Sequence, residues 1–135
     1  MLNFIIVSLL SGFIFGTLDA LINANPFAQR LFTAYKPIMR ENINAALGSV
    51  IDVIYGFVMA GIFLVLMDSL PGSSMIVKGL SYGLLMWFFR VVMHAATHYV
   101  MFKVDMKLVA YTLVTGFVEM MILGVFFGAF LKPLG

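Results

Sequence analysis

Long apolar runs, each interrupted by only a few polar residues, dominate the chain. A bilayer core about 30 Å thick needs roughly 20 apolar residues per helix. Unpaired backbone polar groups are not tolerated in hydrocarbon, so runs of this length are expected to be helical. The pattern therefore predicts an all-α integral membrane protein, a four-transmembrane-helix bundle that forms a single transmembrane domain over residues 1–135, with spans at about 2–22, 46–67, 74–99 and 108–131.

The connection between the first two spans is the longest and has a pattern of its own. Asn25-Pro26 is a plausible helix cap followed by proline at the first helical position. The apolar and basic side chains that follow suit an amphipathic helix at a membrane surface; they are Phe27, Arg30, Leu31, Tyr35 and Lys36. We expect a short interfacial helix there. The first basic residue is Arg30, so we interpret the first span as a retained helix and not a cleaved signal.

Composition supports lipid as the solvent of this chain. Apolar residues make up 63% and charged residues 10%, whereas a soluble domain is nearer half apolar and a quarter charged. The lipid bilayer is therefore the expected partner. The formal charge of +2 is dispersed and forms no basic stripe, so nucleic acid is not expected. Cysteine is absent, which excludes disulfides and thiolate metal ligands.

Basic residues indicate the orientation, because they concentrate in cytoplasmic connections. The first and third connections carry Arg30, Lys36, Arg40, Lys103 and Lys107, whereas the opposite side has only Lys78 and Lys132. We expect a multi-pass protein with both termini outside the cytoplasm. Its general hydropathy resembles that of small bacterial inner-membrane proteins, so the inner (cytoplasmic) membrane is the expected location.

Small residues recur at four-residue spacing in every span. Helices in lipid associate by close packing through such residues. The stripe of the first span is also a candidate contact between two copies of the chain. The predicted packing residues are Ser8, Gly12, Gly16 and Ala20 in the first span, Gly56 and Ala60 in the second, Gly79 and Gly83 in the third, and Gly116, Gly124 and Gly128 in the fourth.

Ionisable residues inside the spans are the main candidates for function. Each costs about 2.5–3.5 kcal/mol at a helix centre on insertion scales. At 100° per residue, each shares the face of its helix that carries small residues. We therefore expect all of them to point into the bundle and to form a polar wedge from the cytoplasmic side to about mid-membrane. The predicted cluster is Asp19, Asp52, Arg90, His94, His98 and Glu119.

The charges of this cluster do not balance. Three carboxylates and one Arg give −3 + 1 = −2 if both histidines are neutral. An uncompensated buried charge is unfavourable. A protonated carboxyl, cationic histidines, a bound cation or penetrating water would each restore balance, and the sequence leaves all of them open.

Individual residues of the cluster allow more than one role. Arg90 is expected to hold helices together by pairing with a carboxylate, or else to contact an anion or substrate. His94 and His98 are spaced i, i+4 and provide at most half of a metal site, with haem ligation as another option. Glu119, alone at mid-depth, suits either a hydrogen-bonded structural role or proton or cation handling.

No complete catalytic motif is present, neither a glycine-rich phosphate loop nor a nucleophile elbow. The sequence favours a small non-enzymatic protein, a subunit or binding module that forms a homo-oligomer or joins a larger membrane complex, and it predicts no cofactor. The alternative is a proton- or cation-handling transporter or channel using the same cluster. A second alternative is a metal- or haem-binding redox protein using His94 and His98.

Overall fold

The computed structural model describes residues 1–134, and these contain helices and no strand. The elements in chain order are α1 (Leu2–Ala24), α2 (Pro26–Leu31), the 3₁₀ helix η1 (Phe32–Ile38), α3 (Ala45–Leu66), α4 (Met75–Met86), the π-helix η2 (Trp87–Val92), α5 (Met93–Met101) and α6 (Met106–Phe130).

Four helices are long and apolar enough to cross a membrane. They are α1 with 23 residues, α3 with 22, the continuous helix Met75–Met101 with 27, and α6 with 25. Each is within three residues of the predicted start and end, since the length of an apolar run fixes the length of its helix. The predicted all-α, four-helix membrane fold is confirmed.

The connection between α1 and α3 contains the expected short helix. The side chain of Asn25 accepts a hydrogen bond from the backbone N–H of Ala28, and Pro26 occupies the first helical position. The 3₁₀ helix η1 continues α2 and ends at Ile38, directly after Pro37. Asn25 donates to the Tyr111 hydroxyl and so holds the start of this segment to α6, and Tyr111 donates to the carbonyl of Ile22 near the end of α1.

The third span has a π-helical segment at its centre that the sequence pattern did not predict. Residues Trp87–Val92 form η2 between the α-helical parts α4 and α5. Trp87 packs into the bundle here and donates from Nε1 to the carbonyl of Leu113 on α6, at 2.9 Å. Segments of this kind are rare and are frequent at functional sites. This one carries Arg90.

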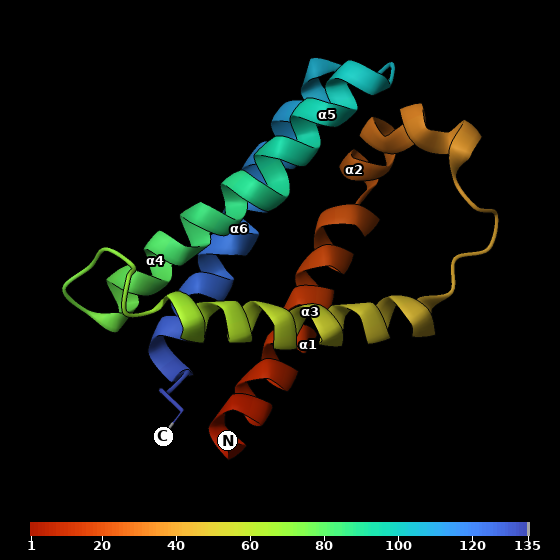
Figure 1. Ribbon diagram of the computed structural model, residues 1–135. Coiled ribbons are helices and arrows are strands. Elements are labelled where there is room, and N and C mark those ends of the chain that lie inside the picture. The colour runs from red at the N-terminus through yellow and green to blue at the C-terminus, as the bar shows by residue number, and fades with distance from the viewer. Residues whose placement is uncertain (135) are drawn as a thin grey trace.

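The bundle consists of two closely packed helix pairs. The rod formed by α4, η2 and α5 lies beside α6, and α1 packs mainly against α3 (Figure 1). Contacts between α1 and α6 join the two pairs. The helix α3 crosses α1 obliquely, so its N-terminal end diverges from the rest of the bundle, whereas its C-terminal end packs against α4 and α6 (Figure 1).

Glycines make both pairs possible. A Cβ on Gly79 would collide with the carbonyl oxygen of Gly124, so the backbones of α4 and α6 touch there. A Cβ on Gly12 would lie 2.8 Å from the Cα of Val53 on α3. The small-residue stripe of α1 was a candidate contact between two copies of the chain. In the structure α3 of the same chain covers it. Ala20, at the end of that stripe, is exposed.

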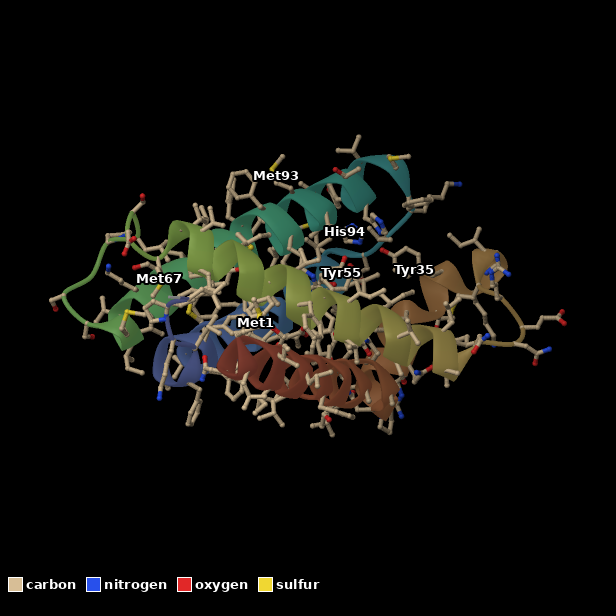
Figure 2. The ribbon with its side chains drawn as sticks, turned by 60° about the horizontal axis from the view of Figure 1, so that its bottom comes forward. Met1, Tyr35, Tyr55, Met67, Met93 and His94 are labelled. Carbon is tan, nitrogen blue, oxygen red and sulfur yellow. The ribbon has the colours of Figure 1, made fainter. Side chains whose placement is uncertain are left out.

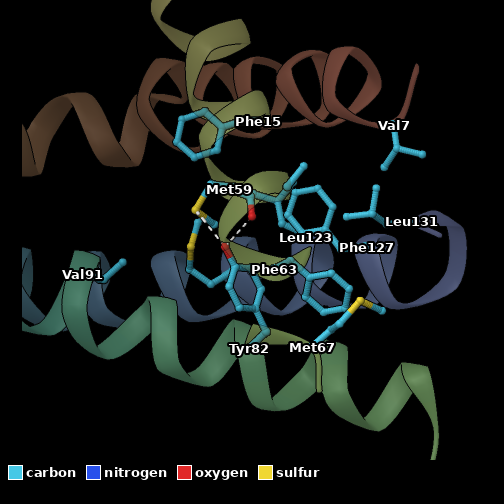
Figure 3. Close-up of a cluster of buried hydrophobic side chains, with 12 residues drawn as sticks. Val7, Phe15, Met59, Phe63, Met67, Tyr82, Val91, Leu123, Phe127 and Leu131 are labelled. Carbon is cyan, nitrogen blue, oxygen red and sulfur yellow. Dashed lines mark hydrogen bonds between the residues drawn. The ribbon is translucent and has the colours of Figure 1, made fainter. Parts of the chain in front are cut away.

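The main hydrophobic core lies near the end of the bundle that contains both termini. The rings of Phe63, Tyr82 and Phe127 pack together, with centroids 5.2 Å apart for Phe63–Tyr82 and 6.0 Å for Phe63–Phe127 (Figure 3). The Tyr82 hydroxyl donates to the carbonyl of Met59 at 2.7 Å. We call this region the apolar half; it comprises Met59, Phe63, Tyr82, Met120, Leu123 and Phe127.

Candidate functional site

A cavity of about 410 Å³ opens at the other end of the bundle. Its walls come from α1, η2, α5 and α6, with one residue of α3, and η1 forms its roof. Figure 2 shows Tyr35, Tyr55 and His94 toward this end, well away from Met67. We call the cavity the vestibule; its ionisable lining residues are Asp19, Tyr35, Tyr55, Arg90, His94, His98 and Glu119.

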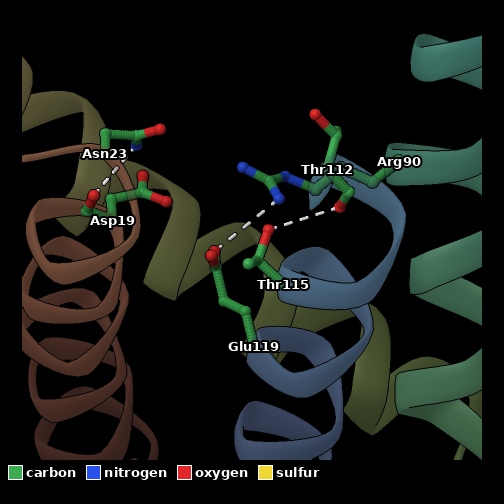
Figure 4. A network of polar contacts seen from close by, with 6 residues as sticks. All are labelled: Asp19, Asn23, Arg90, Thr112, Thr115 and Glu119. Atoms are coloured by element: carbon green, nitrogen blue, oxygen red, sulfur yellow. Dashed lines mark hydrogen bonds and ion pairs between the residues drawn. The ribbon is translucent and has the colours of Figure 1, made fainter. Parts of the chain in front are cut away.

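Glu119 lies in the wall formed by α6 and is the most deeply buried of these residues. It is only 3% exposed, and its Oε1 atom has no hydrogen-bond partner. The nearest cation is Arg90, whose Nη1 lies 3.7 Å from that oxygen (Figure 4). An ion pair at this distance attracts but is longer than a good hydrogen bond. Glu119 therefore keeps an unsatisfied acceptor in the vestibule wall.

Arg90 is held on two sides. Its guanidinium carbon lies 4.6 Å from the ring centroid of Phe15 and 5.3 Å from that of Tyr55. These two rings stack on each other at 5.2 Å. The faces of aromatic rings attract cations, so the stacked pair and Glu119 together fix the guanidinium at the wall of the vestibule.

Asp19 lies across the vestibule from Glu119, on α1 (Figure 4). It is half-buried, and its carboxyl group is close enough to that of Glu119 for a direct interaction. A hydrogen bond between two carboxyl groups requires a proton on one of them. One turn further along α1, Asn23 donates to the backbone carbonyl of Asp19 at 2.9 Å.

The roof is a contact between η1 and α5. The Tyr35 hydroxyl lies 2.9 Å from Nδ1 of His98, and the rings of His94 and His98 have centroids 3.9 Å apart. Partial burial raises the pKa of the Tyr35 phenol above its ordinary value. The phenol therefore keeps its proton at neutral pH and can donate it to a neutral His98.

Asp52 does not line the vestibule. It is half-exposed on α3, and its Oδ2 atom would be 2.9 Å from a Cβ on Gly16 of α1. The expectation was that Asp52 would join the other five residues. Because α3 crosses obliquely, Tyr55 is the residue of α3 that reaches the cavity.

The histidine pair has no complete ligand set around it. Among residues 1–134, no three His, Asp or Glu side chains are grouped so that they could hold a metal ion. His94 is exposed and His98 half-buried. The predicted metal site would have needed Asp19, Asp52 or Glu119 as its third ligand.

Sequence reasoning missed several residues of the site. Tyr35 was assigned only to the interfacial helix, and no local signal places it over His98. Tyr55 and Phe15 were not singled out at all, although each lies one turn from a predicted site or packing residue. Their pairing with Arg90 depends on how α1, α3 and η2 meet.

Comparison with known proteins adds no assignment: no family model matches the chain, and no curated protein or solved structure shows significant similarity to it.

Proposed function

We propose that this small multi-pass membrane protein is a non-enzymatic binding module whose vestibule takes up a proton or a small monovalent cation. The unpartnered Oε1 of Glu119, 3% exposed and in the wall of a 410 Å³ cavity, carries the proposal. A buried acceptor without a donor is unfavourable. A proton or cation in the vestibule removes that penalty.

The charges in the vestibule favour the same class of ligand. With neutral histidines, the lining residues Asp19, Glu119 and Arg90 sum to −2 + 1 = −1, and Asp52, outside the lining but close enough to interact with all three, adds a further negative charge. Net charge is strongly disfavoured in a low-dielectric site unless it is compensated. One positive charge balances the three lining residues, as a proton or a monovalent cation would supply.

The shape of the bundle favours binding over conduction by a single chain. The vestibule lies at one end of the bundle, and the apolar half fills the other end with packed aromatic and aliphatic side chains. The five basic residues of the first and third connections lie at the open end, so we propose that it faces the cytoplasm of a bacterial inner membrane. We expect the module to act as a homo-oligomer or as a subunit of a larger membrane complex.

A second candidate is transport of the same ion, and the π-helix favours it. Arg90, the counter-charge of Glu119, is on η2, where the hydrogen-bond register of the third span is already altered. A shift of this segment toward regular α-helix would turn Arg90 about the helix axis and away from Glu119. Release of the ion to the other side would then need a path through the apolar half or between chains.

Infrared difference spectroscopy on the purified chain in mild detergent tests the proton. We expect a protonated-carboxyl band that shifts in D₂O and is removed by Glu119→Gln. The matched control is Asp68→Asn, an exposed carboxyl at the opposite end of the bundle, which should leave the band unchanged. Calorimetric titration with NaCl or KCl alone tests the cation, with stoichiometric binding abolished in Glu119→Gln. The proposal fails if no such band exists and neither cation binds.

A further inference from the structure

A second hollow, of about 640 Å³, is lined by the α2–η1 segment and the residues directly after it. Its lining includes Arg30, Lys36 and Arg40, together with the single carboxylate of Glu41. The formal charges of these four lining residues sum to 3 − 1 = +2. Among residues 1–134 the one ion pair is Arg90–Glu119, so none of these three cations has a carboxylate within ion-pairing distance.

The position of the hollow places it at a membrane surface. It follows the end of α1 at Ala24 and precedes the start of α3 at Ala45, and both helices are candidate spans. The same segment exposes large apolar side chains: Phe27 by 60%, Ile38 by 66% and Met39 by 49%. A segment that is basic at one place and exposes large apolar side chains beside it suits the boundary between headgroups and acyl chains.

We propose that this hollow binds the phosphate headgroup of an anionic glycerophospholipid. Arg30, Lys36 and Arg40 supply the positive charge for the phosphate, with arginine suited to bidentate contact. Phe32 and Met39 line the same hollow and offer apolar surface to the glycerol and the first methylenes. A free phosphate would satisfy the cations alone and would leave this apolar lining unused.

The hydrogen bonds of the lining leave the cationic groups free for a ligand. Gln29 donates to the carbonyl of Asn23, and Thr33 donates to the carbonyl of Gln29, so both polar side chains stabilise the helical segment itself. The guanidinium and ammonium groups of the three cations make no described hydrogen bond. Clusters of this kind beside a transmembrane helix attract anionic lipids by about 1 kcal/mol per basic residue, which corresponds to about fivefold in affinity.

Native mass spectrometry of the full chain in mild detergent tests the proposal. The probes are phosphatidylglycerol and phosphatidylcholine with identical short acyl chains, and glycerol phosphate without chains. We expect phosphatidylglycerol to bind most tightly. The double variant Arg30→Gln/Arg40→Gln should weaken it about 25-fold, and Glu41→Gln should strengthen it up to about fivefold.

The matched control is Lys103→Gln/Lys107→Gln, which removes the same charge from the same end of the bundle outside the hollow. It should leave the affinity nearly unchanged. Equal losses of phosphatidylglycerol affinity in the two double variants would overturn the proposal. The overall positive potential at this end of the bundle would then account for binding. Equal binding of the two lipids, or of glycerol phosphate and phosphatidylglycerol, would also overturn it. The carboxyl band of Glu119 is measured separately, so failure here is distinct from failure of the vestibule proposal.

Discussion

The apolar half and the vestibule half of the bundle treat buried polar groups in opposite ways. In the apolar half, the Tyr82 hydroxyl is fully buried and donates to the carbonyl of Met59. In the vestibule half, Glu119 is nearly as buried, yet its Oε1 has no donor. Burial alone therefore does not distinguish the two groups. Oγ of Ser8, a packing residue of α1, is also buried without a partner, so Glu119 differs from both Tyr82 and Ser8 in combining an unpartnered buried atom with an ionisable group in the wall of a cavity.

The spacing of small residues explains why the two halves differ. In the apolar half, Gly79 and Gly124 bring the backbones of α4 and α6 into contact. In the vestibule half, Gly116 of α6 faces the side chain of Val91 instead. A side chain between the helices keeps their backbones further apart, and space remains for a cavity beside it.

The largest expected effect concerns the backbone contact of the apolar half. Gly79→Ala should destabilise the protein by about 3 kcal/mol, because the new methyl group meets a carbonyl oxygen that is fixed in a helix. Gly61→Ala is the control, since nothing lies within 4 Å of its Cβ position. Unfolding by denaturing detergent, followed by circular dichroism, measures both. Equal stability of the two variants would show that α4 and α6 do not touch at this point.

The next effect compares the two buried polar groups directly. Tyr82→Phe removes a satisfied hydrogen bond and should cost about 1 kcal/mol. Glu119→Gln should cost less than this, because the carboxylate it replaces has an unsatisfied oxygen and Arg90 keeps its contacts with Phe15 and Tyr55. The same unfolding assay measures both. If Glu119→Gln were the more damaging change, Glu119 would be a structural residue and the contrast between the halves would be lost.

The smallest effect concerns the roof of the vestibule at alkaline pH. Burial raises the pKa of Tyr35, so its contribution to stability is fully present below the pKa of a free tyrosine, about 10. This contribution is lost as the pH rises through the higher pKa that Tyr35 has in the folded protein. The ultraviolet absorbance of tyrosinate is titrated in the wild type and in Tyr35→Phe. The difference between the two curves isolates Tyr35. We expect a midpoint above about 10, and a midpoint at or below it would mean that the roof is open to solvent.

Much of the membrane architecture followed from local pattern. Run lengths fixed the spans, and Asn25-Pro26 fixed the start of the interfacial helix. Helical periodicity placed Asp19, Arg90, His94, His98 and Glu119 on the faces that carry small residues, and the structure gathers these five around one cavity. The same periodicity placed Asp52 near the Gly56 face of α3, and in the structure Asp52 lies against Gly16 of α1, outside the cavity lining.

The amino-acid sequence by itself determined that the chain is helical, how long each span is and which residues are too polar for lipid. These properties depend on nearest neighbours along the chain and on the thickness of a bilayer. Tertiary structure alone decided that α3 crosses obliquely, that the third span contains a π-helix, and that Tyr35 covers His98. Such features arise from contacts between helices distant in sequence, and no repeat or cap within one helix encodes them.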